Sequence, residues 1–341
     1  MDDMDLKEPS GFFLNTAVLH VFDCSSGISV FSQISLNLDD AVIDQYVTKQ
    51  IRRAQNDIRC RKGYFREDSI FLSKLNKFVN QEINFTDFTI EASKEIERFL
   101  REKALKSYDV LYASWTVDDI PYTGFLVLES QPAYIHQTSQ ENGLISNTII
   151  RNHSVMPSAS KKINTFAVIN TAVMEISYCD ATDWGEGDTG FLQDMILNCT
   201  SEPSRKELLD TVNEIAEDIA VQYDENPTLL LSKFKNYVKN NTEESLPLTT
   251  EELAVHVFNE SEEMQNAFIS RSVEHELPAE IDIPRTAAVH KMKNQKIRTD
   301  TGIELTFPTE YFENTDMIEF ITHEDGRISI EIKNIGRITN K

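Results

Sequence analysis

Short segments with β-strand patterning occur near both ends of this chain of 341 residues, and segments with helical periodicity separate them. Residues 16–22 and 28–36 flank a polar turn that contains Gly27, which predicts a β-hairpin. Residues 110–117 and 120–128 flank two aspartates and predict a second hairpin. A chain with this pattern has to bury one face of a sheet against helices, so we expect an α+β fold.

Two further segments favour strands in the same region. Residues 144–150 and 163–177 are rich in β-branched side chains, and we expect them to complete an antiparallel sheet. Apolar residues recur at helical spacing in residues 38–55, 70–79 and 88–105. Residues 59–66 contain Gly63 and are expected to form a loop.

The second half of the chain is predicted to be helical first and then β. Ser204 and Glu207 have the spacing of a capping box, and Thr249 with Glu252 repeats it, so a helix is expected to begin after each. Residues 262–274 predict another helix, and residues 296–298 with 303–307 and 317–322 with 328–332 predict two hairpins. The expected division is an α+β domain over residues 1–200, a helical segment over 201–277 and a C-terminal β-hairpin unit over 278–341.

Basic residues are concentrated in two segments, although the formal net charge of the chain is −23. Residues 49–66 hold seven basic side chains and one acid, and residues 285–298 hold five basic side chains and no acid. A localised basic patch on an acidic chain is able to bind a polyanion in one orientation. The side chains predicted to contact DNA are Lys49, Arg52, Arg53, Arg59, Arg61, Lys62, Tyr64, Arg66, Lys291, Lys293, Lys296 and Arg298.

Two other interpretations of these clusters remain open. The cations also suit a solvated helix face, or ion pairs with the surplus acids. Tyr64 and Phe65 lie among the cations, and exposed aromatic rings beside cations are typical of stacking with single-stranded nucleic acid.

Sequence motifs favour neither an enzyme nor a bound cofactor. Gly185, Gly187 and Gly190 match G-x-G-x-x-G, but the acids between them would repel a pyrophosphate, so we interpret the segment as an acidic loop. Glu331 and Lys333 match the E-x-K of metal-dependent nucleases, but strand alternation places both on an exposed face. We expect no catalytic residues, no metal site and no cofactor.

The cysteines and the hydropathy pattern indicate a cytoplasmic protein. Four scattered cysteines form no C-x-x-C pair and are expected to be reduced and mostly buried. The first residues are acidic, which argues against a secretory signal, and no apolar run reaches the ~18 residues that a membrane span requires.

Several segments resemble a known family. They are the opening strand Ala17-Val18-Leu19-His20-Val21-Phe22-Asp23, the segment Lys62-Gly63-Tyr64-Phe65, the step Phe191-Leu192 and the C-terminal segments 295–305, 318–321 and 325–335. Together they resemble the NdpA-like, 37-kDa-type bacterial nucleoid-associated proteins. The resemblance implies a cytoplasmic protein at the nucleoid that binds DNA and has no known enzymatic activity.

From the charge pattern and this resemblance we expect a non-enzymatic DNA-binding protein with low sequence specificity, acting on duplex or single-stranded DNA. The alternative is an acidic adaptor that binds a protein partner at the nucleoid, with its acidic segment 180–225 as the docking site. A metal-dependent nuclease is the third hypothesis and has the least support. A homodimer is a further expectation, because it would double the basic patch.

Overall fold

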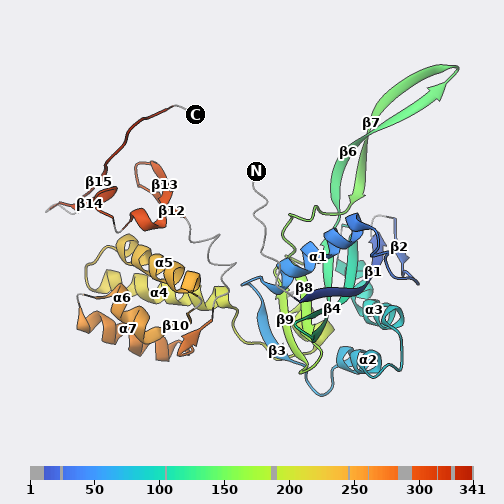
Figure 1. Cartoon of the computed structure of the whole chain (residues 1–341), viewed down its shortest axis with the longest axis horizontal. Coiled ribbons are helices and arrows are strands. Elements are labelled where there is room, and N and C mark those ends of the chain that lie inside the picture. The colour runs from blue at the N-terminus through green and yellow to red at the C-terminus, as the bar shows by residue number, and fades with distance from the viewer. Residues whose placement is uncertain are drawn as a thin grey trace. The chain divides into compact units, whose positions relative to one another are not determined.

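A computed structural model describes residues 11–23, 26–103, 106–185, 190–244, 246–259, 261–282, 294–312, 314–323 and 327–339. The chain forms two compact units, one up to Pro203 and one from Ser204 onward (Figure 1). Each unit has its own hydrophobic core, and each is described by itself below.

The first unit is built on an antiparallel sheet of seven strands in the order β2-β1-β4-β5-β8-β9-β3. Its longest strands, β1, β4 and β5, pair along most of their length, and both predicted hairpins of this region are present. The strands are β1 (Phe12–Asp23), β2 (Ile28–Val30), β3 (Arg61–Tyr64), β4 (Tyr108–Val117), β5 (Ile120–Glu129), β8 (Thr165–Asn170) and β9 (Glu175–Asp180).

Helices cover both faces of this sheet. Val47, Ile51 and Ala54 of α1 (Ala41–Gln55) pack on one face together with Trp115 and Phe166. The opposite face packs against α2 (Ile70–Val79), α3 (Phe85–Lys103) and the π-helical turn η1 (Phe191–Leu197). Because strand side chains alternate between faces, β4 and β5 are apolar on both sides and form the centre of the unit.

Residues 61–64 form the edge strand β3, so the loop expected there was a wrong prediction. Strand β3 pairs with β9, and its other edge accepts hydrogen bonds from the backbone N–H groups of Thr200 and Glu202. A Cβ atom on Gly63 would lie 1.9 Å from the carbonyl oxygen of Thr200, so only glycine permits this approach. The short polar strand has no apolar alternation, which is why the pattern did not indicate it.

The segment 163–177, expected as one strand, is two strands, β8 and β9, joined by a turn in which Met174 has a φ of 56°. Residues 144–150 were expected to complete the main sheet, and this was also wrong. They belong to β7 (Leu144–Val155), which pairs with β6 (Gln131–Glu141) in a separate two-stranded ribbon. Strand pairing therefore depends here on tertiary position and not on local β-propensity.

The second unit begins with a helical cluster. It contains α4 (Arg205–Gln222), α5 (Pro227–Glu244), α6 (Thr250–Val257) and α7 (Glu262–Glu274), packed around one core with the short strands β10 (Leu248–Thr249) and β11 (Glu280–Ile281). The capping box of Ser204 and Glu207 is present at the start of α4, and Thr249 caps α6 as expected.

Both C-terminal hairpins expected from the sequence are present. β12 (Asn294–Arg298) pairs with β13 (Glu304–Pro308), and β14 (Ile318–Thr322) pairs with β15 (Ile328–Ile332). The short helix η2 (Thr309–Tyr311) connects the hairpins, and Phe307, Phe312 and Ile318 form a small core between them. The α+β fold class, with an N-terminal antiparallel sheet, helices in the middle and C-terminal hairpins, is thereby confirmed.

Candidate nucleic-acid interface

Helix α1 places three of the predicted cations on one outer side of the first unit. Asp40 caps the helix by accepting a hydrogen bond from the N–H of Val42 at 2.9 Å. The apolar side of the helix faces the sheet; Arg53 is exposed on the helix, and Lys49 and Arg52 are half-buried. Lys49 lies three and four residues before the two arginines, which is the spacing of neighbours on a helix.

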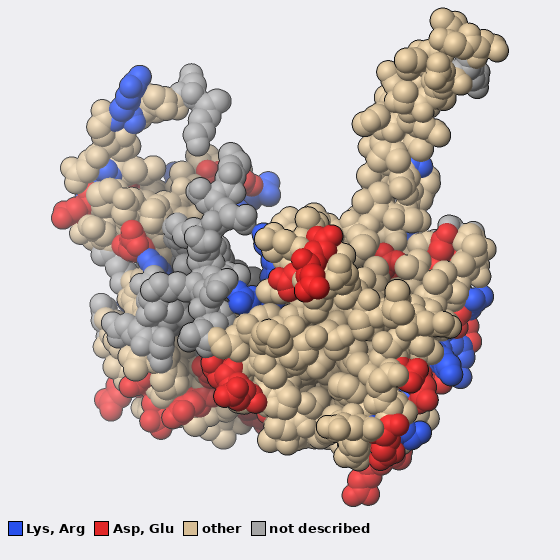
Figure 2. Space-filling model, turned by 45° about the vertical axis from the view of Figure 1, so that its right-hand side comes forward, with Lys and Arg blue, Asp and Glu red and all other residues tan. Residues whose placement is uncertain are grey.

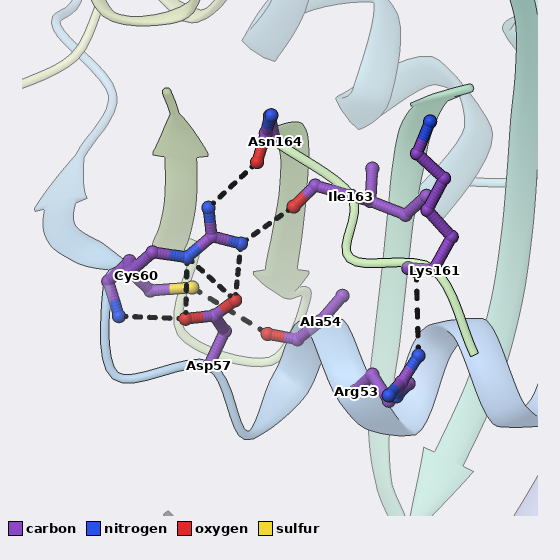
Figure 3. Close-up of polar contacts among 8 residues, drawn as sticks. Arg53, Ala54, Asp57, Cys60, Lys161, Ile163 and Asn164 are labelled. Carbon is purple, nitrogen blue, oxygen red and sulfur yellow. Dashed lines mark hydrogen bonds and ion pairs between the residues drawn. The ribbon is translucent and has the colours of Figure 1, made fainter. Parts of the chain in front are cut away.

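The loop between β7 and β8 lies against the same helix. The hydroxyl of Tyr46 donates to the carbonyl oxygen of Pro157 at 2.8 Å, and Gln50 donates to that of Ser158 at 3.3 Å. Arg53 donates to the carbonyl oxygen of Ala159 at 2.9 Å. It also donates to that of Lys161 at 3.4 Å (Figure 3). The helix and the loop are thus joined by several hydrogen bonds.

This contact brings Lys161 and Lys162 next to the basic residues of α1, which lie about a hundred residues earlier in the sequence. Both lysines are exposed. Burial opposes ionisation of Asp57, which follows α1, but Arg59 lowers the pKa of its carboxyl group and the charge of Lys162 adds a smaller lowering. We call Lys49, Arg52, Arg53, Lys161 and Lys162 the α1 basic surface. Neither lysine was among the predicted DNA contacts, and their only signal in the sequence is a Lys-Lys pair in a serine-rich turn.

Three members of the α1 basic surface have no acidic partner. Within the described part of the chain, Arg52, Arg53 and Lys161 form no ion pair with a carboxylate. The guanidinium of Arg52 lies 4.7 Å from the ring centroid of Phe12, a cation–π contact that fixes its position and leaves its charge uncompensated. Uncompensated charge is the property that attracts a polyanion.

Arg59 has a different environment, because it is largely buried. Its side chain is 11% exposed and forms an ion pair of 2.6 Å with Asp57. It also donates to the carbonyl oxygen of Ile163 at 2.7 Å and to the side chain of Asn164 at 3.0 Å (Figure 3). Burial opposes ionisation of Asp57, but hydrogen bonds from Arg59 outweigh it and keep the pKa of the carboxyl group below its usual range. These contacts join the end of α1 to the start of β8.

The predicted residues of β3 lie beside acids. Lys62 Nζ is 3.5 Å from Glu175, and the hydroxyl of Tyr64 donates to the same carboxylate at 3.4 Å. The charge of Glu175 raises the pKa of Tyr64, whose ring is half exposed. Lys62 and Tyr64 share the sheet face of α1, whereas Arg61, on the opposite face, donates to Ser201 at 3.3 Å.

The remaining members of the first cluster have mixed environments. Arg66 is exposed and lies 3.9 Å from Asp194. The ring of Phe65 is half-buried and stacks on Phe71 with a centroid separation of 6.0 Å, so it packs against the core. Tyr64 is therefore the more accessible of the two rings proposed for base stacking.

The second predicted cluster belongs to the other unit. Lys291 and Lys293 lie outside the described residues. Lys296 and Arg298 are exposed on β12, and Arg298 lies 3.8 Å from Glu304 on β13. An exposed pair at that distance contributes little to stability, so Arg298 is able to exchange its partner for a ligand.

Other chemistry has little support in the described residues. They contain no group of three or more histidine, cysteine, aspartate or glutamate side chains arranged to hold a metal ion. Lys333 of the E-x-K motif forms an ion pair with Glu319 across the C-terminal hairpin. Glu186 and Asp188, the acids between Gly185 and Gly190, lie outside the described residues.

The described cysteines are free thiols. Burial raises the pKa of Cys179 to about 11 and that of Cys199 to about 12, which keeps both protonated and unreactive at neutral pH. None of the helices in the described ranges has a stretch both long and apolar enough to cross a membrane.

The fold and the α1 basic surface define a class of protein: an acidic chain that folds into two compact units, with basic side chains concentrated at one helix of the first unit. The chain belongs to the NA37 family, described as Nucleoid-associated protein YejK, whose family model matches residues 18–339. No curated protein matches the sequence. The suspected relationship to nucleoid-associated proteins is therefore confirmed over nearly the whole chain.

Proposed function

We propose that this protein binds DNA with low sequence specificity, without enzymatic activity, at the nucleoid in the bacterial cytoplasm. The α1 basic surface is the proposed contact, and Lys62 and Tyr64 of β3, on the same face of the sheet, extend it. The supporting observation is that Arg52, Arg53 and Lys161, from two segments about a hundred residues apart in the sequence, have no acidic partner within the described residues. Membership of a nucleoid-associated family supports the same assignment.

Low specificity follows from the type of side chain involved. Lysine and arginine on a convex helix surface bind phosphates, and phosphate contacts orient a protein on DNA without distinguishing bases. Each phosphate contact releases a condensed counterion, so five contacts give a log–log salt slope of about −4 to −5.

The acidity of the chain limits how DNA is able to approach. With a net charge of −23, most of the surface repels phosphates. Binding would therefore be confined to the basic surface, and it would weaken with salt because its affinity comes from phosphate contacts. An acidic protein of this kind would occupy discrete sites and would not coat the duplex.

The test is fluorescence anisotropy with a duplex and a single-stranded oligonucleotide over a range of salt concentrations. The variant Arg53→Gln/Lys161→Gln/Lys162→Gln removes three cations of the α1 basic surface. The control Lys77→Gln/Lys94→Gln/Lys103→Gln removes three exposed cations from α2 and α3, on the opposite face of the sheet. We expect the first variant to lose about 2–3 units of salt slope and the control to match the wild type.

Two results would replace this proposal with one of the alternatives. Equal weak binding by the wild type and both variants would favour the acidic adaptor, which binds a protein at the nucleoid. Cleavage of a plasmid in the presence of magnesium would favour the nuclease.

A further inference from the structure

A two-stranded arm projects from the first unit between the end of β5 and the start of β8 (Figure 1). It consists of the 11 residues of β6, the 12 residues of β7 and a tight turn at Asn142 and Gly143, which have φ angles of 52° and 79°. Within the described residues each of these strands pairs only with the other, so each has an unpaired edge. A two-stranded ribbon is by itself marginally stable in water.

Large apolar side chains are exposed along both faces of the arm. Cross-strand partners share a face, so Ile135 and Ile150 lie on one face and Ile149 lies on the other, opposite His136. Ile149 is 76% exposed and Leu144 is 75% exposed. The exposed apolar residues of the arm are Tyr134, Ile135, Leu144, Ile145, Ile149 and Ile150. Apolar residues exposed together in this way indicate an interaction site.

The arm is almost uncharged. Glu141 and Arg151 are the only charged residues between Gln131 and Val155, although 26% of the whole chain is charged. The space-filling view shows the difference, because the arm is tan and the body is marked with red and blue (Figure 2). A β-ribbon that binds a DNA groove needs cations for the phosphates, so this composition favours a protein partner.

The order of apolar and polar residues in β7 suits pairing with a second copy of the same strand. Residues 144–150 read Leu-Ile-Ser-Asn-Thr-Ile-Ile, which has the same order of apolar and polar side chains in both directions about Asn147. If two copies of β7 pair antiparallel about a two-fold axis at Asn147, Leu144 lies opposite the partner's Ile150. Ile145 lies opposite the partner's Ile149, on the other face. Every apolar residue of the segment then has an apolar neighbour, as an isologous interface requires.

We propose that the arm is a dimerisation element and that β7 pairs with β7 of a second copy of this chain, in the register centred on Asn147. The pairing joins two ribbons into a four-stranded sheet and satisfies the free edge of β7. In this register residues 144–150 of one copy pair with residues 144–150 of the other, at the end of the arm that lies farthest from the body.

Electrostatic repulsion between the two acidic bodies favours contact through the arms. Two bodies of net charge −23 repel each other at short range, and salt screens that repulsion over about 8 Å. A strand of 12 residues extends for about 40 Å, so arms that meet along β7 keep the acidic bodies several screening lengths apart. The proposed dimer does not depend on DNA binding.

Charged substitutions at Ile145 and Ile149 test both the dimer and its register. In this register Ile145→Lys/Ile149→Lys puts like charges opposite each other, whereas Ile145→Lys/Ile149→Glu puts opposite charges there. Within one strand the two positions are four residues apart, too far for direct pairing. Sedimentation velocity of the full chain gives the mass of each protein over a range of concentrations.

We expect the wild type and the Lys/Glu variant to sediment as dimers and the Lys/Lys variant as a monomer. An equimolar mixture of the Lys/Lys variant with Ile145→Glu/Ile149→Glu should again form dimers. The control Val173→Lys, at an exposed residue in the β8–β9 turn at the opposite end of the sheet, should remain dimeric.

Three results would overturn the proposal: a monomeric wild type, a Lys/Lys variant that remains dimeric, or a Lys/Glu variant that dissociates like the Lys/Lys variant. A monomeric wild type whose DNA affinity rises in the Lys/Lys variant would assign the arm to DNA. Added charges on the exposed arm leave both cores unchanged, so circular dichroism should be the same for all variants.

Discussion

At the scale of single residues, Gly63 connects the first basic cluster to the fold. It is the position in β3 where the backbone of residues 198–202 comes closest, and any Cβ atom there would overlap the carbonyl of Thr200. The sequence Lys-Gly-Tyr-Phe therefore reflects packing as well as surface chemistry. A glycine in a strand is typical of such a close backbone approach.

Gly63→Ala is expected to destabilise the first unit by about 2–3 kcal/mol, because the segment 198–202 must move away from β3. Thermal unfolding followed by circular dichroism measures the loss. Gly336→Ala is the control, since a Cβ atom at Gly336 meets nothing within 4 Å. Equal melting temperatures for the two variants would contradict the steric explanation.

His20 and Asp109 are buried ionisable residues with opposite effects on stability. Nδ1 of His20 accepts a hydrogen bond from the N–H of Ser32, so Nε2 carries the proton and donates to Thr89 at 3.0 Å. Burial lowers the pKa of His20 from 6.5 to about 4, and burial raises the pKa of Asp109 from 3.8 to about 6. As the pH falls from 6 to 4, His20 therefore reduces stability while Asp109 increases it.

Asp109→Asn separates the two effects. At pH 7 the folded wild type holds a buried carboxylate, so the variant should be more stable by about 2–3 kcal/mol. Because the folded carboxyl group is protonated below pH 6, this advantage should shrink between pH 6 and pH 4. Urea unfolding of both proteins across this range measures it, and an advantage that is independent of pH would contradict the assignment.

At the scale of secondary structure elements, the clearest signals in the sequence were helix-capping residues and strong apolar periodicity. The capping box at Ser204 located the start of α4, and the apolar stripe of α1 located its buried face. Strand β3 escaped prediction because it is short and polar. β7 was assigned to the wrong sheet because Ile145, Ile149 and Ile150 have the composition of a buried strand, yet are exposed.

The cap of α4 should be measurable on its own. Ser204 accepts a hydrogen bond from the N–H of Glu207, and Glu207 accepts one from the N–H of Ser204. Ser204→Ala removes the first bond and should lower the free energy of unfolding by about 1 kcal/mol. Ser73→Ala, at an exposed position within α2, should not lower the free energy of unfolding in chemical denaturation, because alanine is the better helix former.

Much of the candidate site was visible in the sequence, because a cluster of cations is a property of composition. What each cation does depends on neighbours that the sequence does not reveal. Asp57 and the carbonyl of Ile163 make Arg59 part of the structure, whereas the ring of Phe12 leaves Arg52 charged. Lys161 joined the surface only through the docking of its loop on α1.

At the scale of the whole molecule, the chain forms two compact units with separate cores. Apolar contacts gather on both faces of the first sheet and, independently, around the helices of the second unit. The separation of residues 201–277 from 278–341 as independent parts remains a proposal.

A fragment that ends at Pro203 is expected to fold alone and to retain the salt-dependent DNA binding of the full chain, because it contains the complete α1 basic surface. A fragment that begins at Ser204 should fold and bind DNA weakly. Anisotropy and circular dichroism of both fragments test this. Strong binding by the second fragment alone would move the DNA contact to Lys296, Arg298 and their neighbours.

The position of the β6–β7 arm in the chain has a consequence for evolution. The polypeptide leaves the main sheet after β5 and returns to it in β8, and these two strands are hydrogen-bonded neighbours. Residues can therefore be added to or removed from the arm in pairs without disturbing the register of the sheet. In the proposed dimer, lengthening or shortening this spacer would change the distance between the two bodies.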